Sequence, residues 1–125
     1  MGARVDLIIR DGQIVTPKGV VEGDLAIAGG RIAEIGLNLG HATREISAAG
    51  KYVMPGGVDA HAHIEQMSGM GLMNADTFET ATRSAAMGGT TSVISFAAQA
   101  GGQRLSQKLS DYAARAKRGA MIDYA

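Results

Sequence analysis

The sequence predicts an α/β fold, with an antiparallel β meander in the first half and a β-α-β-α-β order in the second half. Short β-rich runs, separated by Gly, Pro and Asp, fill the first half. In the second half, runs with the apolar spacing of strands alternate with runs that have the apolar spacing of helices. This order implies right-handed crossovers and a parallel sheet. With 46% apolar but only 4% aromatic residues, the core must consist of small aliphatic side chains, which let helices approach sheets closely.

The expected strands of the first half are short and separated by turns. Asp11-Gly12 is a two-residue hairpin signal, and Pro17-Lys18-Gly19 marks the next turn. Ile32 and Ile35 are the expected apolar anchors of a later strand. The expected strands span residues 5–10, 13–16, 20–21, 24–28, 31–36 and 44–47. A single sheet of this kind must cover its apolar face with another layer.

The second half contains three expected strands and two expected helices. The first strand spans residues 58–64 and the second, at 90–97, is an uncharged β-branched run typical of burial on both faces of a parallel sheet. The third strand covers residues 120–125. Because the chain ends inside this apolar strand, we expect the domain to continue beyond it.

Helix signals separate these strands. Asp76 is the expected N-cap of the first helix, with Glu79 completing a capping box and Gly88-Gly89 ending the helix. Its expected buried stripe comprises Phe78, Ala81, Thr82 and Ala85. The second helix is expected over residues 105–118, ended by Gly119, with its apolar face formed by Leu105, Leu109, Tyr112 and Ala116.

Composition and charge exclude several functional classes. Twelve Lys and Arg residues balance twelve Asp and Glu residues, which gives no electrostatic reason to expect nucleic acid or an anionic membrane as partner. The absence of cysteine excludes disulfides, thiolate metal sites and cysteine nucleophiles. The longest uncharged stretch, residues 84–103, is rich in Gly, Ser, Thr and Gln, and the N-terminus shows no secretion signal. We therefore expect a cytoplasmic, globular protein.

His61 and His63 form the strongest chemical motif. They lie two residues apart at the end of the strand at 58–64, so their imidazoles face the same side, together with Asp59. The opposite side carries only apolar residues: Val58, Ala60, Ala62 and Ile64. Two imidazoles on a rigid strand can clamp one divalent metal ion. Two ordinary surface histidines are the alternative interpretation.

The segment that contains these histidines resembles a known family. MPGGVDAHAH at residues 54–63 is similar to the PGxxDxHxH signature of the amidohydrolase superfamily, and residues 78–91 resemble its first barrel helix and second strand. The nearest likeness is to cyclic-amide hydrolases, namely dihydropyrimidinase, D-hydantoinase and their relatives. The opening strands, which end at residues 49–53, resemble their N-terminal β-sandwich segment.

The resemblance implies a domain division and a role for each motif residue. Residues 1–53 would form the β-sandwich segment, and residues 54–125 the first strands and helices of a TIM-like (β/α)8 barrel that is incomplete in this chain. His61 and His63 would hold a divalent metal ion, expected to be zinc and a member of a metal pair, while Asp59 would orient the site. Metal-activated water would then attack the ring amide. The remaining ligands and the catalytic aspartate would lie beyond Ala125, so we expect no catalytic residue here and an inactive isolated chain.

The loop after the histidines is expected to border the substrate. In hydantoinase-like enzymes this loop lines the pocket for the exocyclic side chain of the substrate, and methionine suits an adaptable apolar wall. The residues concerned are Met67, Met70, Leu72 and Met73. Alternatively, these side chains fill gaps beneath the loop.

Two further positions bear on the choice of family. Glu65 occupies the place where dihydroorotase-like enzymes carry a carboxylate-binding arginine, which favours a neutral or lightly charged cyclic ureide as substrate. If the strand continues, Glu65 could also reach the metal side. His41 is a lone loop histidine and is expected to be solvated.

Three functional hypotheses remain open at this point. The first is the N-terminal part of a metal-dependent hydrolase of cyclic amides. The second is a non-catalytic assembly module, like the dihydropyrimidinase-related proteins. The third is a truncated product that folds only as a homo-oligomer, because open strand edges and apolar faces invite pairing. Neither nucleic acid nor a membrane is an expected partner.

Overall fold

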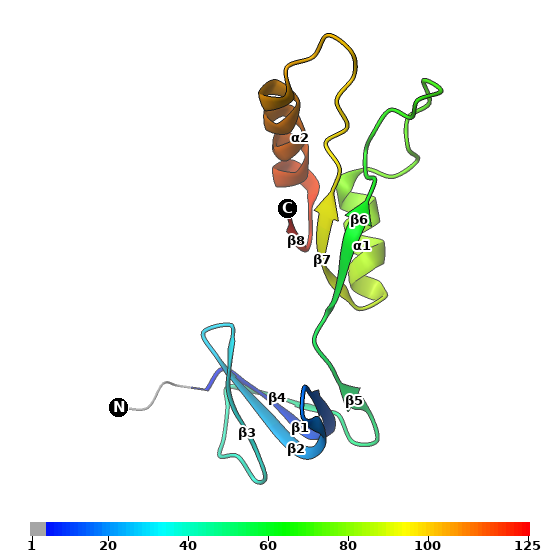
Figure 1. Cartoon of the computed structure of the whole chain (residues 1–125). Helices are drawn as coiled ribbons and strands as arrows, with labels where there is room; N and C mark the ends of the chain where they lie inside the picture. Colours follow the sequence, from blue (N-terminus) through cyan, green and yellow to red (C-terminus); the bar gives the residue numbers. More distant parts are fainter. Residues whose placement is uncertain (1–4) are drawn as a thin grey trace. The chain divides into compact units, whose positions relative to one another are not determined.

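The computed structural model describes residues 5–125 and confirms the α/β class (Figure 1). By their internal contacts the residues form two compact units, one ending at Pro55 and the other spanning Gly56–Ala125. Each unit has its own sheet. Among the described residues, no helix has the length and apolar character needed to cross a membrane.

The first unit is a five-stranded mixed sheet with β1 at its centre. Its strands are β1 (Leu7–Thr16), β2 (Gly19–Ala28), β3 (Arg31–Gly36), β4 (Arg44–Ser47) and β5 (Tyr52–Val53). β1, β2 and β3 form the expected antiparallel meander, but β4 and β5 both pair with β1 in parallel. The expectation of a wholly antiparallel segment is therefore wrong, because the chain after β3 returns to the beginning of β1, where Arg44 pairs with Leu7.

Asp11-Gly12 lies at a β-bulge inside β1, where Arg10 and Asp11 face Asp24, rather than at the expected hairpin. Ile9 pairs with Leu25 and Gly12 with Gly23, so two residues of β1 face one residue of β2. Asp11 adopts φ 56°, a left-handed conformation that Asp tolerates better than most residues. Dipeptides of this type suit a bulge as well as a turn, and the hairpin lies instead at the expected Pro17-Lys18 turn.

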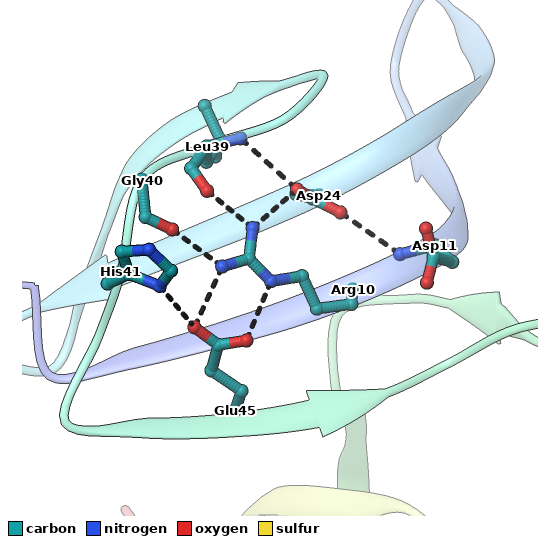
Figure 2. A network of polar contacts seen from close by, with 7 residues as sticks. All are labelled: Arg10, Asp11, Asp24, Leu39, Gly40, His41 and Glu45. Carbon is teal, nitrogen blue, oxygen red and sulfur yellow. Dashed lines mark hydrogen bonds and ion pairs between the residues drawn. The ribbon is translucent and has the colours of Figure 1, made fainter.

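Arg10 holds three segments of the first unit together (Figure 2). Its guanidinium donates to Asp24 on β2 at 2.8 Å and to both carboxylate oxygens of Glu45 on β4, at 2.8 and 3.0 Å. It also donates to the carbonyl oxygens of Leu39 and Gly40, in the connection between β3 and β4. One cation thus satisfies two carboxylates and two backbone carbonyls.

The same contacts shift the ionisation of the network. Hydrogen bonding to Arg10 is the main cause that lowers the pKa of Asp24, helped by the N–H groups of Asp11 and Leu39. Hydrogen bonding to Arg10 likewise lowers the pKa of Glu45, and the two carboxylates raise the pKa of Arg10. His41 lies 3.7 Å from Glu45 with its side chain 99% exposed, as expected for a solvated loop histidine.

One face of the first sheet remains open in the described chain. Ile8, Ile14 and Leu25 are buried, whereas Ile32 and Ile35 are 64% and 39% exposed. The strand expected at residues 31–36 forms, but its apolar anchors Ile32 and Ile35 are not covered, because β3 is an edge strand and no layer of residues 5–55 packs over it.

The second unit confirms the predicted β-α-β-α-β order and its parallel sheet (Figure 1). Its elements are β6 (Gly57–Ala62), α1 (Phe78–Met87), β7 (Thr90–Ser95), α2 (Leu105–Gly119) and β8 (Asp123–Tyr124). The strand order is β6-β7-β8, and both strand pairs are parallel. Each helix is a crossover between neighbouring parallel strands.

The core of this unit lies between the sheet and the two helices. Phe78 and Tyr112 meet edge to face with ring centroids 5.1 Å apart, next to Val93. The hydroxyl of Thr82 is fully buried, donates to the carbonyl of Phe78 and accepts the N–H of Met121 at 2.9 Å. The buried threonine therefore ties α1 to the segment after α2.

Several residues expected in this core are exposed. Val93 is buried in β7, but Ile94 is 46% exposed, so burial on both faces of this strand is not observed within the described chain. Val58 and Ala60 are exposed, unlike Ala62 and Ile64 in the same expected apolar row. On α2, Leu105 and Leu109 are exposed, while Tyr112 and Ala116 are buried. The exposure of Ile94 follows from the layering, because one layer of helices covers one face of this sheet, and the exposure of Val58 and Ala60 accompanies a shift in the register of β6 between Asp59 and Ala62.

The N-cap of α1 lies one residue later than expected. Thr77 accepts the N–H of Thr80 at 3.3 Å, and the hydroxyl of Thr80 accepts the N–H of Thr77 at 3.0 Å. Asp76 instead accepts the hydroxyl of Thr80, and Glu79 pairs with Arg83. A threonine pair supplies the capping box in place of the expected Asp76 and Glu79.

The Arg10 network predicts acid sensitivity of the first unit. Asp24 and Glu45 have pKa values below their ordinary 3.8 and 4.5, so their contribution to stability is present above those values and is lost as pH falls through the lowered ones. Arg10→Met should destabilise this unit at neutral pH and flatten its loss of stability in acid. The stabilities of variant and wild type should converge only at a pH below the lowered pKa values of Asp24 and Glu45. Hydrogen exchange of amides in β1 measures both effects.

The exposed Arg31 on β3 offers a matched control. Arg31→Met removes the same charge outside the network and should retain the wild-type dependence on pH. Parallel curves for Arg10→Met and wild type would contradict the assigned role of Arg10.

Candidate functional site

The candidate site lies where the parallel strands β6 and β7 end. The carboxyl ends of parallel strands meet at the same edge of a sheet, and ligands bind at that edge in α/β folds. His61 lies near the end of β6, His63 follows that strand, and Phe96 follows β7. The N–H of Phe96 donates to the carbonyl of Ala62 at 3.0 Å, which aligns the two strand ends.

The structure brings the two predicted histidines together. Their Nε2 atoms are 3.2 Å apart, and their ring centroids are 5.2 Å apart. Phe96 lies against both rings, with centroid distances of 4.4 Å to His61 and 4.9 Å to His63. The rings of His63 and Phe96 are stacked, with an interplanar angle of 7°.

Phe96 was not identified as a site residue from the sequence. It stands at the end of an apolar run, where it is expected to belong to the core. The sequence did offer one indication, because Phe96 directly follows β7, the strand next to β6. Neighbouring parallel strands end at the same edge of the sheet, so residues that follow them lie close together. The ring restricts the positions that both imidazoles can adopt.

A bulge in β6 accompanies the histidine pair. Asp59 pairs with Val93 and Ala62 with Ser95, so the register of β6 shifts between these two pairs. Asp59 Oδ1 accepts the N–H of His61 at 3.0 Å. The predicted orienting residue therefore contacts the backbone of His61, and no bond from its carboxylate to either imidazole occurs among the described residues.

Gln66 contacts the second histidine and was also missed by the sequence analysis. Its Oε1 lies 3.1 Å from Nδ1 of His63, and the residue is only 7% exposed. The sequence offered little indication of this contact, because a spacing of three residues brings two side chains together regularly only within a helix.

Glu65 turns away from the histidines toward the helices. It adopts φ 50°, and its Oε2 accepts the N–H of Phe78, the first residue of α1, at 3.1 Å. Its Oε1 lies 3.6 Å from Arg118, and its carbonyl accepts a bond from Arg115 at 3.0 Å. The idea that Glu65 joins the metal side is wrong, because β6 ends at Ala62 and the left-handed turn redirects the chain.

The predicted substrate loop is a small hairpin. Met67 and Met73 form an antiparallel bridge, and Ser68 and Leu72 are joined by a backbone hydrogen bond of 2.7 Å. All four predicted loop residues are at least half exposed rather than packed beneath the loop: Met67 57%, Met70 84%, Leu72 64% and Met73 50%. Of these, Met67 lines a hollow of about 290 Å³ beside His63 and Gln66.

The histidine pair fits part of a zinc site. Two nitrogens bound to one tetrahedral zinc at about 2.0–2.1 Å lie about 3.3 Å apart. The observed 3.2 Å between the two Nε2 atoms agrees with that separation. Within residues 5–125 no group of three or more His, Cys, Asp or Glu side chains is placed to hold a metal ion. The described chain thus offers two of the donors such a site needs.

Comparison with known proteins finds extensive similarity to hydantoinases. The chain is 45% identical over 120 residues to a D-hydantoinase of Ralstonia pickettii, which covers 96% of this chain and 26% of that protein. It is 44% identical over 89 residues to an allantoinase of Salmonella paratyphi B, covering 71% of this chain and 19% of that protein. No protein-family model matches it.

Structural comparison agrees. A D-hydantoinase structure matches 96% of this chain with a TM-score of 0.89 and 45% sequence identity, over 26% of its own length. The chain therefore belongs to the D-hydantoinase-like amidohydrolases, as an N-terminal portion. It spans about a quarter of the length of the D-hydantoinases it matches.

The contacts of Glu65 predict a graded mutational series. Glu65→Ala should destabilise the second unit by about 0.5–2 kcal/mol, because the first N–H of α1 loses its carboxylate acceptor. Glu65→Gly loses the same acceptor but accommodates φ 50°, so it should be more stable than Glu65→Ala by about 1 kcal/mol. Glu65→Gln retains an acceptor and should be the mildest change. Urea unfolding followed by circular dichroism at the helical band measures all three, because both helices belong to this unit. If Glu65→Gly were the least stable of the three variants, the backbone strain assigned to the left-handed conformation of residue 65 would be contradicted.

Proposed function

We propose that this chain is the first part of a metal-dependent hydrolase of cyclic amides, and that the reaction belongs to a longer protein. The observation that carries the proposal is the 3.2 Å separation of the two Nε2 atoms at the end of β6. The similarity to D-hydantoinases and an allantoinase supports a hydantoin- or dihydropyrimidine-type ring as substrate.

Each site residue receives a physical role in this proposal. His61 and His63 would hold the divalent metal, proposed to be zinc and one of a pair. When bound, the metal would lower the pKa of water and polarise the ring carbonyl. Asp59 holds the backbone of His61 through its N–H. Phe96 excludes water from one face of His63 and limits its rotation.

The apolar residues of the hairpin between Met67 and Met73 are the proposed wall for the side chain of the substrate. Its apolar residues are exposed, so they are available to contact a ligand. Met67 lies nearest to the histidines, beside the hollow that His63 also lines. Met70, Leu72 and Met73 would contribute the outer part of this wall, where flexible methionines adapt to different substituents.

The remaining proposals concern the protein as a whole. The β-α-β-α-β unit would be the first part of a (β/α)8 barrel, and the first sheet would be part of a β-sandwich. The isolated chain would be inactive, because the described residues supply two metal donors and no catalytic acid or base. We also propose a cytoplasmic homo-oligomer. A non-catalytic oligomeric module is the second candidate, favoured by exposed apolar residues on both sheets, among them Ile32 and Val58.

Native mass spectrometry with zinc tests the metal site. Wild type should bind zinc, and His61→Ala/His63→Ala should lose it. His41→Ala is the matched control, because His41 is 99% exposed and belongs to the other unit, so this variant should bind like wild type. Equal zinc binding by wild type and the double variant would overturn the site. The same spectra report the oligomeric state, and an exclusively monomeric chain would count against self-association.

A further inference from the structure

We infer that Gln66 is a positioning residue for His63: its amide oxygen holds the Nδ1–H and leaves the Nε2 lone pair directed toward His61. The inference rests on the proposed metal-binding function, because it concerns which imidazole nitrogen is free to bind. It goes beyond that function by adding a residue that would not touch metal or substrate.

The backbone of Gln66 is anchored on both sides. Its N–H donates to Oδ1 of Asn74, and its carbonyl accepts the N–H of Asn74, each at 2.8 Å. The residue is only 7% exposed. The amide group therefore projects from a fixed position, and its oxygen stays 3.1 Å from Nδ1 of His63.

This contact selects one tautomer of His63. A neutral imidazole carries one N–H, and an amide oxygen can only accept a hydrogen bond. With Oε1 of Gln66 facing Nδ1, the proton of His63 must sit on Nδ1, and Nε2 keeps its lone pair. Metal-binding histidines are commonly held in this way, with the second ring N–H donated to an oxygen acceptor.

The remaining contacts of Gln66 and His63 agree with this role. The amide nitrogen of Gln66 is buried and has no hydrogen-bond partner within residues 5–125, so the only side-chain bond that Gln66 makes there is the one to His63. Stacking on Phe96 fixes the plane of the imidazole. Within that plane, the bond to Gln66 decides which nitrogen faces His61.

The test begins with the metal-free wild-type chain, labelled with ¹⁵N-histidine. Long-range ¹H–¹⁵N spectra of the neutral imidazoles report the tautomer of each of the three histidines. We expect His63 to carry its proton on Nδ1. A proton on Nε2 of His63 in wild type would overturn the inference without any mutation.

Three variants then separate positioning from structure. Gln66→Met keeps the length of the side chain but removes the acceptor, so it should shift His63 toward the Nε2–H form and weaken zinc binding about tenfold. Gln66→Glu keeps an acceptor oxygen and should restore both the Nδ1–H form and the affinity. Ser68→Ala removes the hydroxyl that accepts the N–H groups of Met70 and Leu72 at the tip of the same hairpin, and should match wild type in both readouts.

The outcomes test the role of Gln66 separately from the proposed metal-binding function. Unchanged tautomer and affinity in Gln66→Met, with zinc bound by wild type, would overturn the role of Gln66 and leave the metal site standing. Absence of zinc binding by wild type, with the tautomer still dependent on Gln66, would overturn the metal function and retain the effect of Gln66 on His63. An equal loss of affinity in Ser68→Ala would show a general effect of the hairpin and would also overturn the inference.

Discussion

Parallel pairing of β6 with β7 is the constraint on which the candidate site depends. Because both strands run in the same direction, their carboxyl ends lie at one edge, joined by the bond from Phe96 to Ala62. That alignment places an aromatic ring from one strand against imidazoles from the other, although the residues lie far apart in sequence. Parallel pairing in turn requires a crossover, which α1 supplies. The helical layer and the site are consequences of the same strand arrangement.

The few residues after β6 serve both packing and chemistry. His63 faces the open edge of the sheet, whereas Ile64 is buried and its carbonyl accepts the hydroxyl of Tyr112 on α2 at 2.5 Å. Glu65 then turns through a left-handed conformation and binds both helices through its carboxylate and its carbonyl. The position of the histidine is therefore coupled to the packing of the helices, since one short segment makes both sets of contacts.

Several local features could be predicted because they depend on residue type and short spacing. The histidine pair, the alternation of strands and helices, and the boundaries of β3 and β4 are of this kind. Two of the errors occurred where two nearby arrangements use the same residues. Asp11-Gly12 is compatible with a bulge and with a hairpin. Thr77 and Thr80 form the capping box of α1, a role that Asp76 and Glu79 could also fill by residue type. In each case a contact with a distant segment, or a difference of one residue in register, decides between the alternatives.

Local patterns were enough to predict the α/β class, the order of elements in the second unit and the placement of two imidazoles at the end of a strand. Apolar periodicity and a spacing of two residues are local properties, so they do not depend on how distant segments meet. Its likeness to hydantoinases also follows from the linear motif and is confirmed by the comparisons. Tertiary structure alone decided that β4 and β5 run parallel to β1 and that Glu65 faces the helices. It also decided that Phe96 and Gln66 adjoin His63, because ring stacking and side-chain hydrogen bonds depend on how segments meet in space.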